Sequence, residues 1–336
     1  MDKYRVTFRY VIIRIMKKWI DRAVKHYKYA EPIDRDESVK TFLNMYDLYT
    51  QKEDLRKNIK TVRLCLSGIP NSTHIKAKKL LFQGDEDCWK YFERTAVFLT
   101  NGHSNGDWIE EMSFPLAYAL YVERKDLIDQ LFDFLLSILT NEQNLSDKYF
   151  KKQKLYASTQ LIHFLLEKWL GYNPVKELVM NYGTGYGIYQ KIIDNWEDLS
   201  QIDNSYWDEL CEFHLKGIGL QRGEKWENEE FLTSGMIPME LINLQKVRKY
   251  LGLDVPQIKN ELFSTNMAKS PKIPTGYNED LDVMFQMVFL TIQNQRKYTI
   301  EEVVDLIKKK HEHDNLRICI KTIRCSYVRW CDWFRT

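Results

Sequence analysis

Apolar residues recur every three to four positions along most of this chain, and that spacing most constrains the fold. One such stripe, within 127–138, consists of Leu127, Ile128, Leu131, Phe134, Leu135 and Ile138. A stripe with this period lies on one face of an α-helix, whereas the strict alternation of a half-buried strand is almost absent. Glycine (14) and proline (8) are few in 336 residues, so few positions interrupt a helix. The chain is therefore expected to be all-α.

Turn and capping residues divide this pattern into successive helices. They are expected at about 38–66, 74–82, 85–99, 108–121, 127–138, 147–170, 175–180 and 238–252. Short connections between helices favour an irregular antiparallel bundle or array, and no fixed repeat period supports a regular solenoid.

Two helix ends carry specific signals. Pro238 lies at a helix start and Gly252 just beyond its end, which is the usual asymmetry of these residues. The buried stripe between them is predicted to be Leu241, Leu244, Val247 and Leu251. Thr299 and Glu302 have the spacing of a capping box for a helix that continues to about residue 310.

Composition shifts suggest four regions. Residues 1–84 form an N-terminal helical region, 85–263 a central helical domain, 264–276 a linker, and 277–336 a small C-terminal unit. The linker is polar and contains Pro271, Pro274 and Gly276. The stretch 316–334 is ambiguous between helix and strand.

The chain has the features of a cytoplasmic protein. No run approaches the roughly 18 apolar residues of a membrane span, and the N-terminus has no signal-peptide pattern. The six cysteines are scattered, which favours reduced thiols. The net charge of +2 gives no global indication of nucleic-acid or membrane binding.

The segment Asn181–Ile188, NYGTGYGI, resembles a phosphate-binding loop. A dinucleotide site needs a strand before the glycines, and a P-loop needs Lys-Ser or Lys-Thr after them. Here the preceding residues have a helical pattern, the spacing is Gly-x-Gly-x-Gly, and neither pair follows. We predict a turn between helices, where glycine permits a positive φ.

Two further groups of residues could bind a metal or act in catalysis, but the sequence evidence for each is weak. His311 and His313 could bind a metal together with Cys319, Cys325 and Cys331, but zinc ligands usually come in tight pairs, and a solvated helix end is the simpler interpretation. Cys211 and His214 lie one helical turn apart, as packed residues often do. No catalytic residue, cofactor or metal is therefore expected. A metal-dependent hydrolase is the least favoured alternative.

The charge distribution is uneven. The 24 residues 192–215 contain no lysine or arginine but seven acids, interleaved with Trp196, Tyr206, Trp207 and Phe213. The acids are Asp194, Glu197, Asp198, Asp203, Asp208, Glu209 and Glu212. Residues 1–29 are the reverse, with nine Lys or Arg against two Asp, a balance of +7.

Two interpretations of the acidic segment stay open. It could be a surface that binds a basic protein, with aromatic anchors among the carboxylates. Alternatively, the aromatic rings belong to the core and the acids form one solvated helix face. These acids would then pair with a basic N-terminal helix, which is predicted by the apolar stripe Phe8, Ile12, Ile15, Trp19, Ala23 and Tyr27. That helix could instead bind nucleic acid, but its broad apolar stripe favours packing, so direct nucleic-acid binding is not expected.

Two segments resemble a known group of proteins. The first contains Asp107-Trp108-Ile109, Phe114–Leu120 and Arg124–Ile128, and the second contains Tyr206–His214, Met236-Ile237-Pro238 and Gly252–Val255. Their order resembles the all-helical immunity proteins of bacterial polymorphic-toxin systems, especially those that neutralise PoNe-type nuclease toxins and those of a neighbouring helical immunity family. The resemblance covers about 85–267. Residues 1–84 match no part of it, and Phe231–Gly235 lacks the aromatic-glycine cluster of that group.

The resemblance implies a non-catalytic protein that binds a cognate toxin, a nuclease with a basic surface, and occludes its active site. We expect the toxin-binding residues to be Asp194, Glu197, Asp198, Trp207, Asp208, Glu209 and Glu212. A helical scaffold or regulatory module that binds another protein is the alternative.

Overall fold

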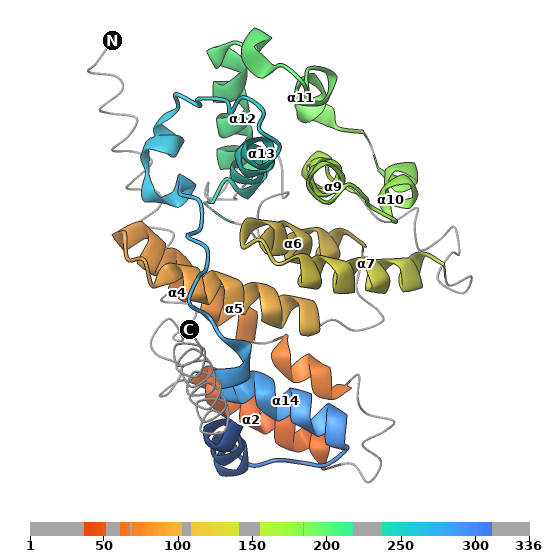
Figure 1. The fold of residues 1–336 in the computed structure, drawn as a ribbon, viewed down its shortest axis with the longest axis vertical. Helices are drawn as coiled ribbons and strands as arrows, with labels where there is room; N and C mark the ends of the chain where they lie inside the picture. Colours follow the sequence, from red (N-terminus) through yellow and green to blue (C-terminus); the bar gives the residue numbers. More distant parts are fainter. Residues whose placement is uncertain are drawn as a thin grey trace, which may run out of the picture. The chain divides into compact units, whose positions relative to one another are not determined.

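The computed structural model describes residues 37–51, 61–67, 69–102, 109–140, 155–183, 185–217, 235 and 237–310. Their regular secondary structure is helical, which confirms the all-α prediction (Figure 1). Across these residues the only strand-like pairing is one parallel bridge between Leu155 and Gly183. No described helix is long and apolar enough to cross a membrane. The basic segment 1–29, the His311–Cys331 candidates and the stretch 316–334 lie outside the described residues.

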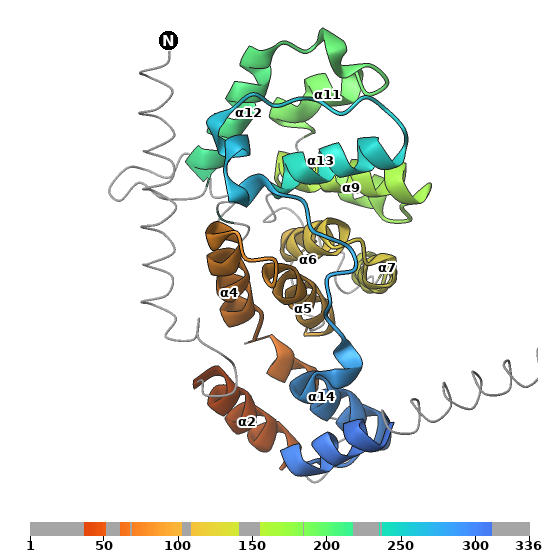
Figure 2. The same ribbon diagram turned by 60° about the vertical axis from the view of Figure 1, so that its left-hand side comes forward.

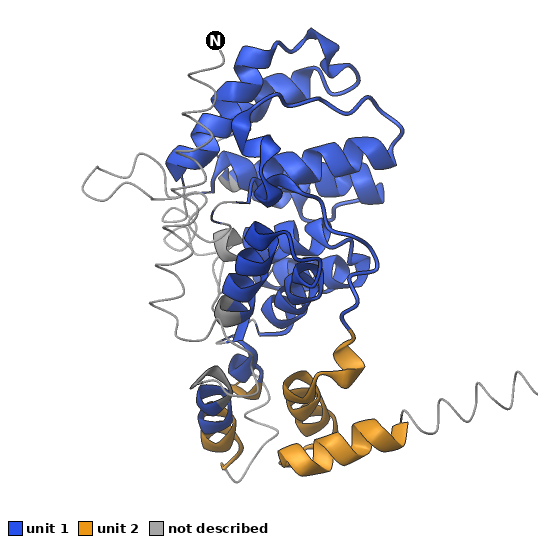
Figure 3. Cartoon of the chain, turned by 90° about the vertical axis from the view of Figure 1, so that its left-hand side faces the viewer, with its two compact units in different colours: residues 1–44, 63–277 blue, residues 45–62, 278–336 orange. Residues whose placement is uncertain are grey.

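The chain forms two compact units, residues 1–44 with 63–277 and residues 45–62 with 278–336 (Figure 3). Helix α2, Glu37–Thr50, crosses the division between them. The sequence-based domain boundaries did not anticipate that residues 45–62 group with the C-terminal region.

After 3-10 helix η2 (Leu64–Leu66), the first unit contains four helices that pack on their sequence neighbours. They are α4 (Ile69–Gln83), α5 (Cys88–Asn101), α6 (Ile109–Tyr121) and α7 (Lys125–Leu139), and α4 lies beside α5 in both views (Figures 1 and 2). Pro70 lies in the first turn of α4, where a missing N–H costs little, so the helix starts earlier than predicted. The α7 stripe is buried as predicted, except that Phe132 replaces Phe134 in the core.

The rest of the first unit contains α9 (Ala157–Leu170), α10 (Lys176–Tyr182), α11 (Gln190–Asp194), α12 (Asn204–Gly217) and α13 (Met239–Tyr250). Helix α13 packs against both α6 and α9 (Figure 2). Leu241, Leu244 and Val247 are buried as predicted. Leu251 was predicted wrongly: it is 40% exposed, because the helix ends at Tyr250 and the chain turns away through Gly252 at φ 69°.

Three polar side chains on α13 are also buried: Glu240, Asn243 and Arg248. Each meets a polar partner on another segment. Asn243 Nδ2 donates to the Ala117 carbonyl oxygen at 3.0 Å, and Arg248 Nε donates to the Asp254 carbonyl oxygen at 2.7 Å. A buried polar group is costly unless it is hydrogen-bonded, so these contacts fix how α13 packs.

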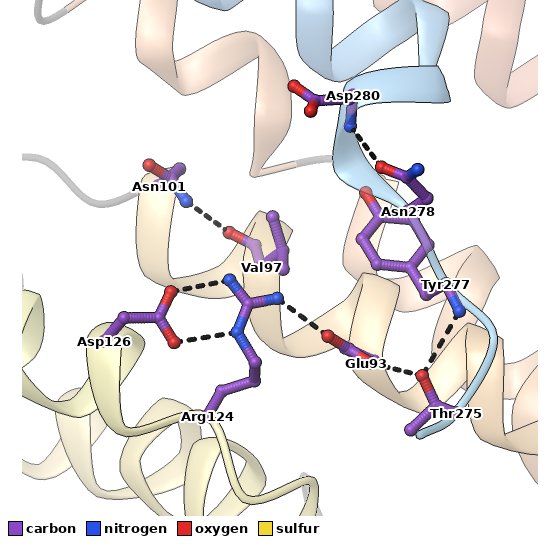
Figure 4. A network of polar contacts seen from close by, with 9 residues as sticks. All are labelled: Glu93, Val97, Asn101, Arg124, Asp126, Thr275, Tyr277, Asn278 and Asp280. Carbon is purple, nitrogen blue, oxygen red and sulfur yellow. Dashed lines mark hydrogen bonds and ion pairs between the residues drawn. The ribbon is translucent and has the colours of Figure 1, made fainter. Parts of the chain in front are cut away.

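The segment predicted as a linker, 264–276, lies against the helices of the first unit. Met267 is buried, Asn266 Nδ2 donates to the Phe82 carbonyl oxygen at 3.1 Å, and the Tyr121 hydroxyl donates to the Lys269 carbonyl oxygen at 2.9 Å. The same segment continues to Thr275, whose hydroxyl donates to Glu93 on α5 (Figure 4).

Arg124, just before α7, joins this network (Figure 4). Its guanidinium binds both carboxylate oxygens of Asp126, at 2.8 and 2.6 Å, and also binds Glu93 at 2.7 Å. Hydrogen bonding to Arg124 lowers the pKa of the Asp126 carboxyl. A bidentate guanidinium–carboxylate pair is geometrically specific, so Arg124 fixes the turn between α6 and α7 relative to α5.

The second unit contains 3-10 helix η7 (Glu279–Leu281), α14 (Val283–Asn294) and a helix over 300–310. Asp282 caps α14 by accepting from the Phe285 N–H at 3.3 Å. The predicted capping box is confirmed: the Thr299 N–H donates to Glu302 Oε2 at 2.8 Å, and the Glu302 N–H donates to Thr299 Oγ1 at 3.2 Å. The buried Tyr46 hydroxyl lies 2.5 Å from Thr291 Oγ1 and accepts the Tyr298 N–H at 2.9 Å.

Candidate protein-binding surface

The glycine-rich segment is a turn between helices, as predicted. Helix α10 precedes Gly183, and 3-10 helix η3 (Gly187–Tyr189) leads into α11. Gly185 and Gly187 have φ of 87° and 50°, in the region that favours glycine. Gly183 lies so close to Gln160 that an added Cβ would be 1.7 Å from its Nε2. The glycines therefore serve backbone geometry and close packing.

Cys211 and His214 are buried together with Glu240. His214 Nδ1 lies 2.8 Å from Glu240 Oε1, which joins α12 to α13. Burial, and next the Glu240 carboxylate, raise the pKa of the Cys211 thiol well above its ordinary value. Because the thiolate is the nucleophilic form, these contacts favour a packing role for the pair.

No metal-binding group of three His, Cys, Asp or Glu side chains occurs within the described ranges. The candidate at His311 and His313 falls after residue 310, where the description ends. A metal at that site therefore stays a hypothesis.

All seven carboxylates of the acidic segment are exposed: Asp194, Glu197, Asp198, Asp203, Asp208, Glu209 and Glu212. None forms an ion pair with another residue that the structure describes. Asp208 and Glu209 precede Glu212 by four and three positions, so both are its neighbours on the exposed side of α12. We call these seven residues the acidic surface.

The aromatic residues of the segment are not exposed as anchors would be. Trp207 was expected to contact the partner but is only 4% exposed, and its ring meets Tyr206 edge to face with centroids 5.8 Å apart. Trp196 is buried as well. The rings of Trp196, Tyr206 and Trp207 are therefore core, Phe213 is half-buried, and the charged groups that the segment exposes are its carboxylates.

Local hydrogen bonds hold the four aspartates in place. Asp198 caps 3-10 helix η4 (Leu199–Gln201) by accepting from the Ser200 N–H at 2.9 Å. Asp203 accepts from the Tyr206 N–H at 3.0 Å and from the Ser205 hydroxyl at 2.6 Å, at the start of α12. These bonds, to Ser200 and Ser205 respectively, lower the pKa of both carboxyls. Asp194 accepts from Gln190 Nε2 at 2.8 Å and Asp208 from Asn260 Nδ2 at 2.6 Å.

The three glutamates differ from the aspartates. Among the described residues, Glu197, Glu209 and Glu212 have no hydrogen-bond or ion-pair partner. Burial raises the pKa of the Tyr206 phenol well above its ordinary value, and the carboxylates of Glu209 and Asp194 raise it further. Acids from α11 and α12 therefore lie around one tyrosine, although 15 positions separate them in the sequence.

Arg248 is a buried cation that lies near part of this surface. It lies at the C-terminal end of α13 and donates to the carbonyl oxygens of Trp196 and Asp254. Burial lowers its pKa, while Asp254, Glu197 and Asp198 oppose that change. Sequence reasoning missed Arg248, because a basic residue in a last helical turn usually signals exposure and a favourable helix dipole.

No protein-family model, curated protein or solved structure matches this chain. The motifs that carry the resemblance have structural roles here. Arg124 and Asp126 fix the turn before α7, and Gly252 ends α13 with a positive φ. Such roles fit many helical proteins, so the family assignment stays a prediction.

Proposed function

We propose that this chain is an immunity protein, which binds a cognate bacterial toxin through the acidic surface and occludes the toxin's active site. The observation that supports this proposal is the exposure of all seven carboxylates, without an ion-pair partner among the described residues. A surface of one charge sign attracts a partner of the other sign and rejects wrong partners.

A nuclease is the kind of toxin that this surface fits best. An enzyme that binds nucleic acid presents cationic side chains to phosphates, and clustered carboxylates can occupy the same cleft. Seven negative charges in 24 residues, with no cation among them, give a high local density for such a match.

The fixed aspartates support rapid and specific binding. Asp198 and Asp203 cap helices, so their carboxylates are already oriented before a partner arrives. Preorganised groups lose less side-chain entropy on binding than mobile ones. The unpartnered glutamates can adapt to the partner's cations.

The described cysteines agree with a reducing compartment, and we propose that the protein acts in the cytoplasm. Cys65, Cys88 and Cys211 are free buried thiols. Burial raises the pKa of Cys65 and of Cys88 to about 12 each, so both stay protonated and unreactive.

Growth of cells that express the protein encoded by the neighbouring gene tests this proposal. That protein should be lethal alone and harmless when co-expressed with this chain. Reversal of three unpartnered acids, Glu197→Lys with Glu209→Lys and Glu212→Lys, should abolish protection. A neighbour that is harmless alone, yet binds this chain through the acidic surface, would instead indicate the scaffold or regulatory function.

A control pair of acids, compared with the double variant Glu209→Lys and Glu212→Lys, separates the acidic surface from total charge. Glu301 and Asp305 are exposed acids one helical turn apart on the 300–310 helix, and neither has a partner among the described residues. Glu301→Lys with Asp305→Lys should leave protection intact. Equal loss with the control pair would count against the acidic surface.

A further inference from the structure

The acidic surface lacks an exposed aromatic anchor of its own, because Trp196 and Trp207 are buried. Protein interfaces usually concentrate their binding energy on a few aromatic or arginine side chains. Among the described residues, the most exposed large apolar side chain is Tyr250, at 62%. It is the last residue of α13, and Leu251 follows it on the surface.

The exposed ring of Tyr250 packs against a second aromatic ring. It meets the Trp169 ring edge to face, with centroids 6.2 Å apart and planes at 84°. An aromatic side chain that is rigid before binding loses little entropy in a complex. Tyr250 is therefore suited to be an anchor and not only a solvated residue.

The same rings already hold a cation. Lys125 Nζ lies 5.0 Å from the Trp169 centroid and 5.5 Å from the Tyr250 centroid. A cation over an aromatic face is attracted by the ring quadrupole. The chemistry of this site is thus suited to a lysine or arginine side chain.

Carboxylates of the acidic surface lie close to the same end of α13. Arg248, two positions before Tyr250, donates to the carbonyl oxygen of Trp196, the residue before Glu197. Glu197, Asp198 and Asp254 all favour the charged form of Arg248, so all three lie near it. Lys168, beside Trp169 on α9, places its Nζ 5.7 Å from the Trp196 ring centroid. Tyr250 and the three carboxylates therefore lie toward the same, C-terminal end of α13.

We propose that Tyr250 is the aromatic anchor of the toxin-binding surface, and that it receives a lysine or arginine side chain of the basic partner. Glu197, Asp198 and Asp254 bind further cations of the same partner. This inference rests on the proposed function and adds two residues outside the acidic segment, Tyr250 and Asp254, that the partner must contact.

Titration calorimetry with the protein encoded by the neighbouring gene tests the anchor. Tyr250→Ala should weaken binding about ten-fold, whereas Tyr250→Phe, which keeps the ring face, should stay within about three-fold of the native chain. Phe289→Ala is the matched control, because Phe289 is 51% exposed on α14 in the other unit, and it should change nothing.

A second variant distinguishes a cation contact from a merely structural role. Lys125→Gln removes the ammonium group that competes for the rings, so it should tighten binding roughly two- to three-fold. A Tyr250 that served only to pack α13 on α9 would instead make Lys125→Gln neutral or weakening. That result would overturn the proposal.

Comparison of these variants tests the role of Tyr250 separately from the proposed function. If Tyr250→Ala binds normally while Glu209→Lys with Glu212→Lys weakens binding, the anchor is wrong and the acidic surface stands. If all of these variants bind like the native chain, both ideas fail. If the native chain self-associates alone and Tyr250→Ala abolishes this, the patch is an interface between copies and the proposal is overturned.

Discussion

His214 and Glu240 face each other across the contact of α12 with α13, with Nδ1 2.8 Å from Oε1 and both side chains buried. Removing either side chain would leave the other one buried without this partner, which is costly for a polar or charged group. Glu240→Ala should therefore lower the free energy of unfolding by about 3 kcal/mol, measured by urea denaturation. A double-mutant cycle with His214→Ala should show a coupling above roughly 1 kcal/mol. Simple additivity would mean that the contact contributes nothing specific.

The buried His163 side chain should make the folded protein less stable at acidic pH. Burial lowers its pKa from 6.5 to about 4, and Asn173 Nδ2, 3.1 Å from Nδ1, partly opposes this. Because the folded-state pKa lies below the unfolded one, protonation favours unfolding. The contribution is present above pH 6.5 and is lost as pH falls from 6.5 toward 4.

The size of the acid effect can be checked by denaturation at several pH values. The shift corresponds to roughly 3 kcal/mol at most. His163→Gln should flatten the profile between pH 6.5 and 4. His74 contributes in the same direction, since burial and Lys78 lower its pKa, so His163→Gln should not remove the whole slope. An unchanged profile in this variant would contradict the assignment.

Because Gly183 and Gln160 are in close contact, substitutions at the two positions should have non-additive effects on the free energy of unfolding. An added Cβ would lie 1.7 Å from Gln160 Nε2, and Gln160 is fully buried. Gly183→Ala should cost about 1–3 kcal/mol by overpacking, and less in a Gln160→Ala background. Gly185→Ala is the matched control: it has open space but φ 87°, so its cost of about 1 kcal/mol should be the same in both backgrounds.

The hydrogen bonds of Arg248 should hold the segment that carries Glu197 against α13. Arg248→Met removes its donors to the carbonyl oxygens of Trp196 and Asp254. Hydrogen bonds from charged groups contribute about 1.5–3 kcal/mol each, so unfolding should become easier by at least about 2 kcal/mol. Hydrogen exchange should also rise selectively near residues 196–198. Unchanged exchange there would show that Arg248 does not hold this segment.

Local sequence patterns predicted the helices well. The α7 stripe, the capping box at Thr299 and the turn at Gly252 each depend on residues within one or two turns of one another. Helix α4 begins earlier than predicted, because Pro70 is compatible with the first turn of a helix. The prediction relied on the apolar pattern and did not take this property of proline into account.

Long-range pairing could not be predicted in the same way. Tyr46 meets Thr291, 245 positions away, and thereby groups residues after 44 with the C-terminal helices. No periodicity in either segment indicates the other. The buried Arg248 is a similar case, because its carbonyl partners become visible only once α11 and α13 are packed.

The candidate site was predicted in part. The charge pattern identified seven acids, and all seven are exposed in the structure. The same pattern suggested Trp207 as an aromatic anchor, but Trp207 is buried. Acidic and aromatic residues alternate along α12 with the helical period, so the rings face the core whenever the acids face solvent. Tyr250 was missed because it follows the basic residues Lys246, Arg248 and Lys249 at a helix end and lies outside the acidic segment.

The most direct test of the acidic surface is the salt dependence of its association rate with the protein encoded by the neighbouring gene. Stopped-flow measurements would compare the native chain with Glu197→Lys, Glu209→Lys and Glu212→Lys combined. We predict a native rate constant of about 10⁷ M⁻¹s⁻¹ or more at low salt that falls steeply as salt is added, and a slower rate with a flatter dependence for the triple variant. Equal rates and equal salt slopes for the two proteins would contradict the central claim.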